Sequence, residues 1–194
     1  MITPRILVLS GSTRGGSYNS RLAALAVKEL ALIDAVPTRI SLADYPLPLF
    51  DADLETDAGI PAHARRLVGL LQAHDGVFIA APEYNAGIAP VLKNAIDWMS
   101  RVHPDSEEGL PATTAFHGRA FALASASSES HGGLRGLMAL RQVLELGLGA
   151  SVLPDQVTVA DAGHAFTERD DLADRALAVR FRGLIGRLAG GGLH

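Results

Sequence analysis

The sequence predicts an α/β fold in which a five-stranded parallel sheet carries helices on both faces. Short, continuously apolar runs, which are typical of strands buried on both faces, alternate with segments that repeat apolar residues at helical spacing. Parallel strands need crossover connections, and helices usually supply them. Because the chain has 194 residues and is 48% hydrophobic, it can bury the core of one such domain, which we expect over residues 1–189.

The first strand is predicted over residues 5–10, an apolar run that ends at a glycine. Asn19 is well placed to cap the helix that follows. That helix is marked by an apolar stripe at Leu22, Leu25, Ala26, Leu30 and Ile33. A second strand is expected over residues 36–42. Residues 43–61 are rich in Asp and Pro and show no periodicity, so they are predicted to form a long loop.

The remaining elements repeat the same alternation. Further strands are predicted over residues 76–81, 120–124 and 150–153, and a helix over residues 134–148. Another helix opens near Pro90, since proline is favoured in a first helical turn. Apolar spacing marks the helical faces at Leu67, Leu70, Leu71 and His74, at Leu92, Ala95, Ile96 and Met99, and at Leu177, Phe181, Leu184, Ile185 and Leu188. Residues 190–194 are expected to be frayed.

Composition excludes several kinds of function. The chain has no cysteine, so redox chemistry requires a bound organic cofactor or a metal held by other side chains. Its seven histidines are scattered without metal-ligand spacing, so we expect no metal. No Ser/His/Asp set for nucleophilic catalysis is evident either. No basic cluster exceeds the pair Arg65-Arg66, which argues against nucleic acid. Without a long apolar run or a signal-peptide pattern, no membrane partner and a cytoplasmic location are expected.

The loop after the first predicted strand has the composition of an anion site. Residues 11–20 read Gly-Ser-Thr-Arg-Gly-Gly-Ser-Tyr-Asn-Ser, which combines glycines, hydroxyls and the single cation Arg14 directly before a helix. Glycine lets backbone N–H groups turn inward, and a helix N-terminus favours negative charge. The segment lacks the lysine of a Walker A loop and the spacing of dinucleotide-binding folds. An ordinary glycine-rich turn remains the alternative.

Two more polar loops follow strands at the same predicted edge of the sheet, where ligands of open α/β sheets collect. Residues 82–90 place an acid, an aromatic and an amide directly after an apolar strand, and a simple turn before a helix is the alternative. Residues 125–133 are small and polar and end in Gly132-Gly133. This third loop could serve only as a helix cap.

Together these segments resemble the NADPH-dependent FMN reductase family, which includes quinone, chromate and azo-dye reductases. The resemblance rests on residues 11–20, on the run Pro-Glu-Tyr-Asn-Ala-Gly-Ile-Ala-Pro-Val-Leu-Lys-Asn-Ala-Ile-Asp-Trp-Met-Ser-Arg at residues 82–101, and on the glycine pair. It implies a flavodoxin-like three-layer sandwich, FMN as cofactor and NADPH or NADH as co-substrate. It also implies a homodimer or homotetramer.

The resemblance further implies the roles of individual residues. The FMN phosphate would be held by Ser12, Arg14, Ser17, Asn19 and Ser20. The isoalloxazine ring would be contacted by Pro82, Glu83, Tyr84, Asn85 and Gly87, and its edge by Ser125, Ser127, His131 and Gly132. The chemistry would take place at N5 of the flavin, so no catalytic side chain is expected.

The expected activity is a ping-pong reductase that passes electrons from NAD(P)H through FMN to a small acceptor: a quinone, a flavin, an azo compound or a metal oxyanion. The alternatives are a flavodoxin-type electron carrier, which is usually more acidic than a net charge of -4, and a flavin-free scaffold. On the helix after the second loop, Asp97 and Arg101 are expected to form an i, i+4 ion pair. Trp98 is expected to face either the core or a partner subunit, and the resemblance favours the partner subunit.

Overall fold

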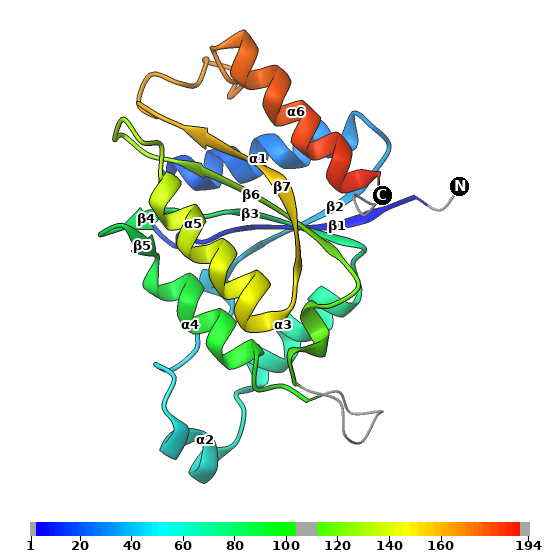
Figure 1. The fold of residues 1–194 in the computed structure, drawn as a ribbon, viewed down its shortest axis with the longest axis vertical. Helices are drawn as coiled ribbons and strands as arrows, with labels where there is room; N and C mark the ends of the chain where they lie inside the picture. The colour runs from blue at the N-terminus through cyan, green and yellow to red at the C-terminus, as the bar shows by residue number, and fades with distance from the viewer. Residues whose placement is uncertain (1–2, 104–111, 191–194) are drawn as a thin grey trace.

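The computed structural model describes residues 3–103 and 112–190, and its centre is a parallel sheet of five strands (Figure 1). The strands lie in the order β2-β1-β3-β6-β7. They are β1 Arg5–Ser10, β2 Val36–Ser41, β3 Gly76–Ala80, β6 Ala120–Ala126 and β7 Ser151–Val159. Every neighbouring pair in this sheet is parallel, which confirms the predicted sheet. The fifth strand runs well beyond its predicted end, because an irregularity in its register with β6 carries the pairing past a proline.

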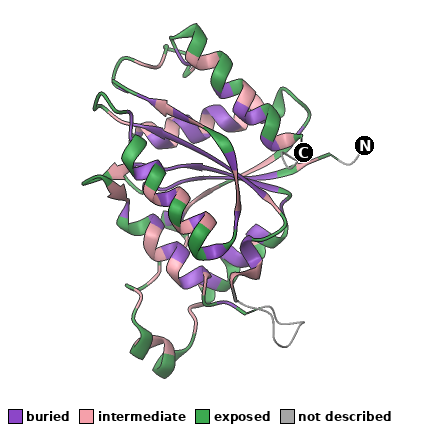
Figure 2. Ribbon diagram, in the orientation of Figure 1, coloured by how far each residue is buried: buried purple, intermediate pink, exposed green. Residues whose placement is uncertain are grey.

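Helices cover both faces of the sheet, as the alternating pattern predicts. One face is covered by α1 (Tyr18–Ala31) and α6 (Arg175–Ala189), and the other by α3 (Ala62–Gln72), α4 (Pro90–Met99) and α5 (Leu134–Gln142). The buried apolar residues form two clusters, one under each helical layer. Figure 2 shows this burial running through the strands and the inward sides of the helices. The fold is thus the expected three-layer sandwich.

Several predicted elements differ in detail from the structure. The helix after β6 is α-helical only to Gln142 and continues as a π-helical turn, η3 (Val143–Gly147). Ile33 lies beyond the end of α1 and is half exposed, so it is not part of the buried stripe. His74 lies beyond the end of α3, although its side chain is buried. The predicted tail falls outside the described residues except Gly190, which caps α6.

The long loop predicted over residues 43–61 is interrupted by helical structure. A 3-10 turn, η1 (Leu42–Asp44), opens the segment, and a short helix, α2 (Ala52–Ala58), lies within it. The Asp51 side chain caps α2 by accepting a hydrogen bond from the Asp53 N–H at 2.8 Å. This helix has no buried residue and protrudes from the body (Figure 1), which explains why it leaves no apolar periodicity in the sequence.

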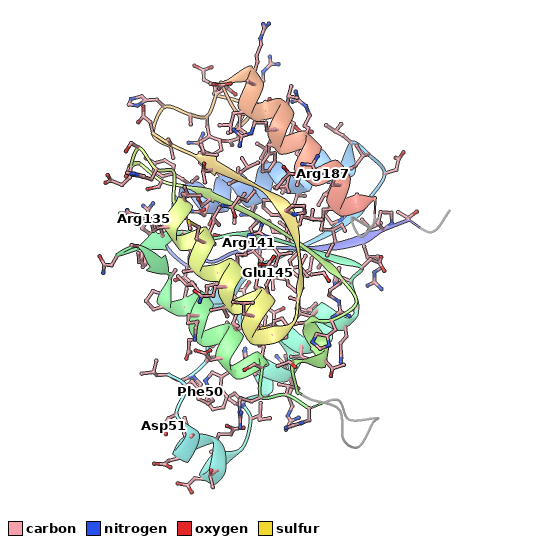
Figure 3. The ribbon with its side chains drawn as sticks, in the orientation of Figure 1. Phe50, Asp51, Arg135, Arg141, Glu145 and Arg187 are labelled. Atoms are coloured by element: carbon pink, nitrogen blue, oxygen red, sulfur yellow. The ribbon has the colours of Figure 1, made fainter. Side chains whose placement is uncertain are left out.

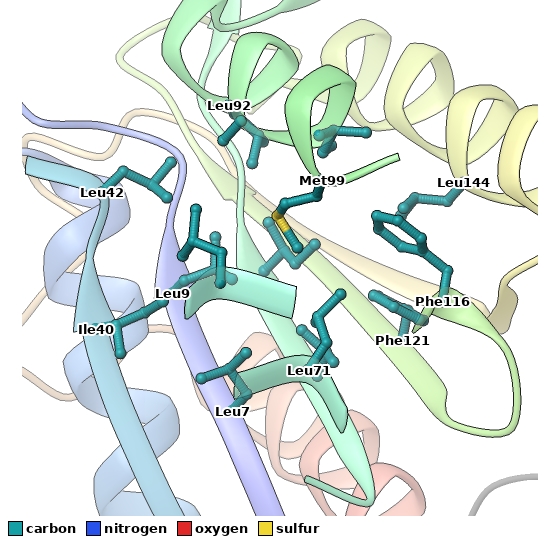
Figure 4. Close-up of a pocket in the computed structure, with 15 residues that line it drawn as sticks. Leu7, Leu9, Ile40, Leu42, Leu71, Leu92, Met99, Phe116, Phe121 and Leu144 are labelled. Carbon is teal, nitrogen blue, oxygen red and sulfur yellow. The ribbon is translucent and has the colours of Figure 1, made fainter. Parts of the chain in front are cut away.

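The cavity shown in Figure 4 lies inside the apolar layer between the sheet and α3, α4 and η3. Its lining side chains are apolar, among them Leu7, Leu71, Leu92 and Phe116. Its volume of about 30 Å³ has room for little more than a water molecule or two. A cofactor must therefore bind elsewhere.

Two further findings concern the described residues as a set. No helix among them is both long enough and apolar enough to cross a bilayer. Within the same residues, no three side chains of His, Cys, Asp or Glu come together in a way that could share a metal ion.

Candidate functional site

Three polar loops meet at the carboxyl edge of the sheet. They follow β1 (residues 11–17), β3 (residues 81–89) and β6 (residues 127–133), three strands that are neighbours in the sheet. The strand order reverses between β1 and β3, and ligands of open α/β sheets bind at such a point. Figure 1 shows the loop after β6, the connection after β3 and the start of α5 on the same side of the molecule.

Backbone contacts fix these loops relative to one another. The Gly11 N–H donates to the Ala80 carbonyl at 2.8 Å, and the Ala81 N–H donates to the Ala124 carbonyl at 2.8 Å. Gly11 also packs closely: a Cβ there would lie 2.8 Å from Leu92 and 3.1 Å from Pro82. Only glycine fits at this position, so the first loop passes directly over the start of the second.

The first loop is a tight turn held by its own hydroxyls. The Ser10 hydroxyl accepts from the Ser12 N–H at 3.2 Å, and the Ser12 hydroxyl accepts from the Arg14 N–H at 3.3 Å. The Ser20 hydroxyl lies 3.4 Å from that of Ser10. At the tip, Gly16 has a φ of +67°, a left-handed conformation that glycine adopts without strain. The turn leads the chain straight into α1.

The N-terminus of α1 has backbone N–H donors without acceptors in the described structure. Its cap residue, Ser17, is buried but makes no side-chain capping bond, and the first turn holds no acidic residue. Among the described residues, the N–H groups of Tyr18 and Asn19 have no backbone acceptor. The exposed Arg14 guanidinium has no hydrogen bond or ion pair in the part of the chain that the structure describes. Free N–H groups, a hydroxyl and a guanidinium are the donor set that suits a phosphate.

Two other helices of the sandwich, α5 and α6, lack this opening. The N-terminus of α6 is capped by Asp174, whose carboxylate accepts from the N–H groups of Ala176 and Leu177 at 2.7 and 3.0 Å. That of α5 is met by the carboxylate of Glu83. Because a carboxylate already fills the anion position on both helices, the start of α1 is the better place for a bound anion.

Asn19 does not cap α1 as predicted. The cap is Ser17, and Asn19 lies inside the first turn with its side chain buried. Its amide donates to the Ala126 carbonyl at 2.9 Å and accepts from the Ala126 N–H at 3.0 Å. Both hydrogen-bonding groups of Ala126 are thereby satisfied at the end of β6, so Asn19 ties the first loop to the third.

The second loop folds into a small hairpin rather than a simple turn. Its strands are β4 (Glu83–Tyr84) and β5 (Gly87–Ile88), and they pair antiparallel. The two turn residues, Asn85 and Ala86, have φ angles of +50° and +63°. Positive φ at both central positions is typical of a type I′ turn, which asparagine tolerates and alanine does not favour. The Pro82 side chain is buried at the start, whereas Tyr84 is half exposed.

Glu83 turns its carboxylate toward α5. Arg135 donates to the Glu83 carboxylate from Nε at 2.7 Å and also from its terminal nitrogen, and the Gly136 N–H donates at 3.1 Å. Only 7% of the Glu83 side chain is exposed. Burial raises the pKa of Glu83, but the hydrogen bonds from Arg135 and Gly136 and the charge of Arg135 outweigh it, so the pKa falls below its ordinary value.

The third loop is closed by its own contacts. The fully buried Ser125 hydroxyl donates to the Gly132 carbonyl, and the Ser127 hydroxyl accepts from the Glu129 N–H at 3.1 Å. Gly132 and Gly133 have φ angles of +59° and +85°, and a Cβ on Gly133 would collide with the Ser125 hydroxyl. His131 is exposed at the tip. Both serine hydroxyls thus help to shape the loop.

The expected ion pair between Asp97 and Arg101 is wrong, and Trp98 takes the core position rather than the partner-facing one that the resemblance favours. Asp97 pairs with Lys93, one helical turn earlier, at 2.6 Å, and Arg101 instead reaches Glu55 of α2 at 2.9 Å. Trp98 does not face outward: it is fully buried within its own chain, and its indole N–H donates to the Pro48 carbonyl at 2.8 Å. Both differences arise from residues 43–61, because Glu55 pairs with Arg101 and the Pro48 carbonyl accepts from Trp98.

The structure also identifies site residues that sequence reasoning missed. Arg135 and Gly136 were not singled out, although they hold Glu83. A Cβ on Gly136 would lie 3.0 Å from the Glu83 Cα and 3.1 Å from the Gly87 carbonyl, so α5 touches both strands of the hairpin. The spacing of Gly132, Gly133 and Gly136 is the one signal in the sequence that could have marked this close approach.

The sequence of this chain is similar to those of known reductases. Residues 4–164 match the family model described as NADPH-dependent FMN reductase. A quinone reductase of Escherichia coli is 36% identical over 140 residues, which cover 72% of this chain and 69% of that protein. An NAD(P)H-dependent FMN reductase of Pseudomonas aeruginosa is 34% identical over 171 residues, covering 88% of this chain and 85% of that protein.

Solved structures show the same fold. The flavoenzyme NAD(P)H:(acceptor) oxidoreductase FerB of Paracoccus denitrificans superposes with a TM-score of 0.74 at 23% identity, over 97% of this chain and 96% of that one. The apo form of the NADH:FMN oxidoreductase EMOB gives a TM-score of 0.70 at 21% identity, over 96% and 89% of the two chains. At these identities the likeness establishes the flavodoxin-like fold, and the sequence relatives carry the functional comparison.

Proposed function

The chain belongs to the NADPH-dependent FMN reductase family, and from this premise we propose where it binds FMN and which acceptors it reduces. Membership makes it an oxidoreductase with FMN as cofactor and NAD(P)H as co-substrate, and not a simple electron carrier. Bound FMN accepts a hydride at N5 and passes the electrons to a second substrate. The role of the protein is to bind the flavin, to orient it and to leave one face of its ring open.

The phosphate of FMN is proposed to bind at the start of α1. Its ligands would be the hydroxyls of Ser12, Ser17 and Ser20, the guanidinium of Arg14 and the backbone N–H of Asn19. The proposal is supported by the unused donors of that helix and by the absence of an acidic residue in its first turn. The Asn19 side chain, already engaged with Ala126, would act by holding the loop in place.

The isoalloxazine ring is proposed to lie against the hairpin and the third loop. Its contacts would come from Pro82, Glu83, Tyr84, Asn85, Gly87, Ser125, Ser127, His131 and Gly132. Since the Glu83 side chain is engaged elsewhere, Glu83 would contribute backbone groups. Ser125 is fully buried within β6, so it would act indirectly, by holding the Gly132 carbonyl in place. Fixed backbone N–H donors beside N5 favour the reduced flavin and orient the ring without a proton-donating side chain.

Quinones are the proposed acceptors, with flavins, azo compounds and metal oxyanions as further candidates, and the reaction is proposed to be ping-pong. Quinones come first because the Escherichia coli relative is a quinone reductase. A planar acceptor suits a site whose exposed aromatic, Tyr84, stands at the rim of the hairpin. NAD(P)H and the acceptor would use the same open face in turn.

The single observation that carries the site proposal is the free N-terminus of α1 with the unpaired Arg14 beside it. The test is to add FMN to the cofactor-free protein and follow flavin fluorescence, then NADPH oxidation with a quinone present. We expect tight FMN uptake and quinone-dependent turnover with parallel lines in double-reciprocal plots. A protein that takes up no FMN would refute the proposal, and intersecting lines would refute the ping-pong order.

A homodimer or homotetramer in the cytoplasm is also part of the proposal. Its support is the outer face of α5 and η3, where Leu134, Met138 and Leu146 are 38%, 60% and 80% exposed. Large apolar side chains that stay exposed along one helical segment are the kind of group that a subunit contact would cover. Sedimentation of the wild-type protein and of Met138→Lys tests it: the variant should shift toward the monomer, and an unshifted oligomer would place the interface elsewhere.

A further inference from the structure

The β4–β5 hairpin is too small to hold its own conformation. Each of its strands has two residues, and isolated hairpins even of larger size are marginal in water. Its turn places Ala86 at a φ of +63°, a left-handed conformation that the Cβ of an L-residue disfavours. Strained residues persist only where the surroundings hold them. The restraint on the turn must therefore come from outside the hairpin.

The Glu83 carboxylate supplies this restraint by joining the hairpin to α5. One of its oxygens accepts from Arg135, and the other accepts from Gly136, the third residue of the helix. Figure 3 shows Arg135 at the start of α5, on the side of the hairpin. Because the carboxylate also fills the N-terminal end of the helix, its loss would leave both a guanidinium and a helix N–H without their acceptor.

The contact is close as well as polar. A Cβ on Gly136 would meet Glu83 and the Gly87 carbonyl at 3.0–3.1 Å, so the helix touches both strands. The strained turn lies between those strands, one residue beyond Tyr84 on one side and one before Gly87 on the other. Any movement of Glu83 away from α5 would therefore also displace the backbone N–H groups of the turn.

We propose that Glu83 is a positioning residue, whose contact with Arg135 and α5 fixes the turn at residues 85–86 and thereby sets how strongly the site prefers reduced over oxidised FMN. The inference rests on the proposed placement of the ring against the hairpin. Fixed N–H donors stabilise the charge that reduction brings to the flavin, so a loosened turn costs the reduced form more than the oxidised form.

The test compares Glu83→Ala with Arg135→Ala by measuring the midpoint potential of bound FMN and the dissociation constant of oxidised FMN. If Glu83 acts by positioning the turn, both variants should lower the preference for reduced FMN by about tenfold. This corresponds to a drop in the midpoint potential of about 30 mV for a two-electron couple. Charge alone predicts opposite shifts, since removing an anion favours reduced FMN and removing a cation disfavours it. Shifts of opposite sign would overturn the proposal.

The matched control is Glu145→Gln, which removes a carboxylate from an arginine pair on the same helical segment, 2.7 Å from Arg141 (Figure 3). It should leave the potential unchanged, and a shift equal to that of Glu83→Ala would overturn the proposal. Thermal unfolding establishes that each variant folds. If Glu83→Ala does not fold, Glu83→Gln keeps the side-chain volume and an acceptor for Gly136 and should give a smaller shift of the same sign.

The two hypotheses fail in different ways. A wild-type protein that binds no FMN refutes the proposed function. A wild-type protein that binds FMN normally, with the potential unmoved in both Glu83→Ala and Arg135→Ala, refutes only the positioning role.

Discussion

Replacing Arg14 with alanine removes one contact to the proposed phosphate and little else. The side chain is exposed and has no partner in the part of the chain that the structure describes, so the variant should fold with unchanged stability. A hydrogen bond to a charged group contributes about 1.5–3 kcal/mol. Since about 1.4 kcal/mol corresponds to a tenfold change, the dissociation constant for FMN should rise roughly 10- to 150-fold.

The assay is a fluorescence titration of the cofactor-free protein with FMN and, in parallel, with riboflavin, which lacks the phosphate. Arg14→Ala should weaken FMN binding and leave riboflavin binding unchanged. Arg66→Ala is the control, because this exposed arginine lies on α3, away from the first loop. Equal losses for the two flavins, or an unchanged dissociation constant for FMN, would show that the phosphate binds elsewhere.

Three further predictions concern stability and burial. Asn19→Ala should lower the free energy of unfolding by roughly 2–4 kcal/mol in urea, because two buried backbone groups of Ala126 lose their partner; a change below 1 kcal/mol would contradict this. The only tryptophan, Trp98, should show blue-shifted emission and weak acrylamide quenching at every protein concentration, whereas quenching that grows on dilution would place it at a subunit interface. Because the pKa of Glu83 is lowered on folding, the stability difference between wild type and Glu83→Gln should hold above pH 4.5 and shrink as the pH falls below it; a constant difference would contradict the ion pair with Arg135.

The local pattern of the chain predicts most of the fold. A strand such as β1 is a run of apolar residues bounded by polar ones, and this character does not depend on distant partners. The same is true of the glycine-rich loop before α1, whose hydroxyls and arginine are consecutive in the sequence. Segments with little burial are harder to predict: α2 buries no residue, so its helix rests on the cap at Asp51 rather than on periodicity.

The candidate site is predicted less completely, because several of its side chains act on distant residues. Asn19 is of a residue type that often caps helices, but its hydrogen-bond partner, Ala126, lies 107 positions later in the sequence. The indole N–H of Trp98 finds its acceptor 50 positions earlier, in a segment that showed no pattern. A sequence gives the donor and acceptor types of such groups but not which of them meet.

By itself, then, the sequence determined the parallel sheet, its two helical layers and the polar composition of the three loops at the carboxyl edge, since each depends on residues that are close together in the chain. Only the tertiary structure decided how those loops are held. It left the start of α1 free for an anion, filled the start of α5 with the Glu83 carboxylate and buried Trp98 against residues 48–50. The physical reason is that hydrogen bonds between elements depend on how the helices pack on the sheet, a property of the whole fold.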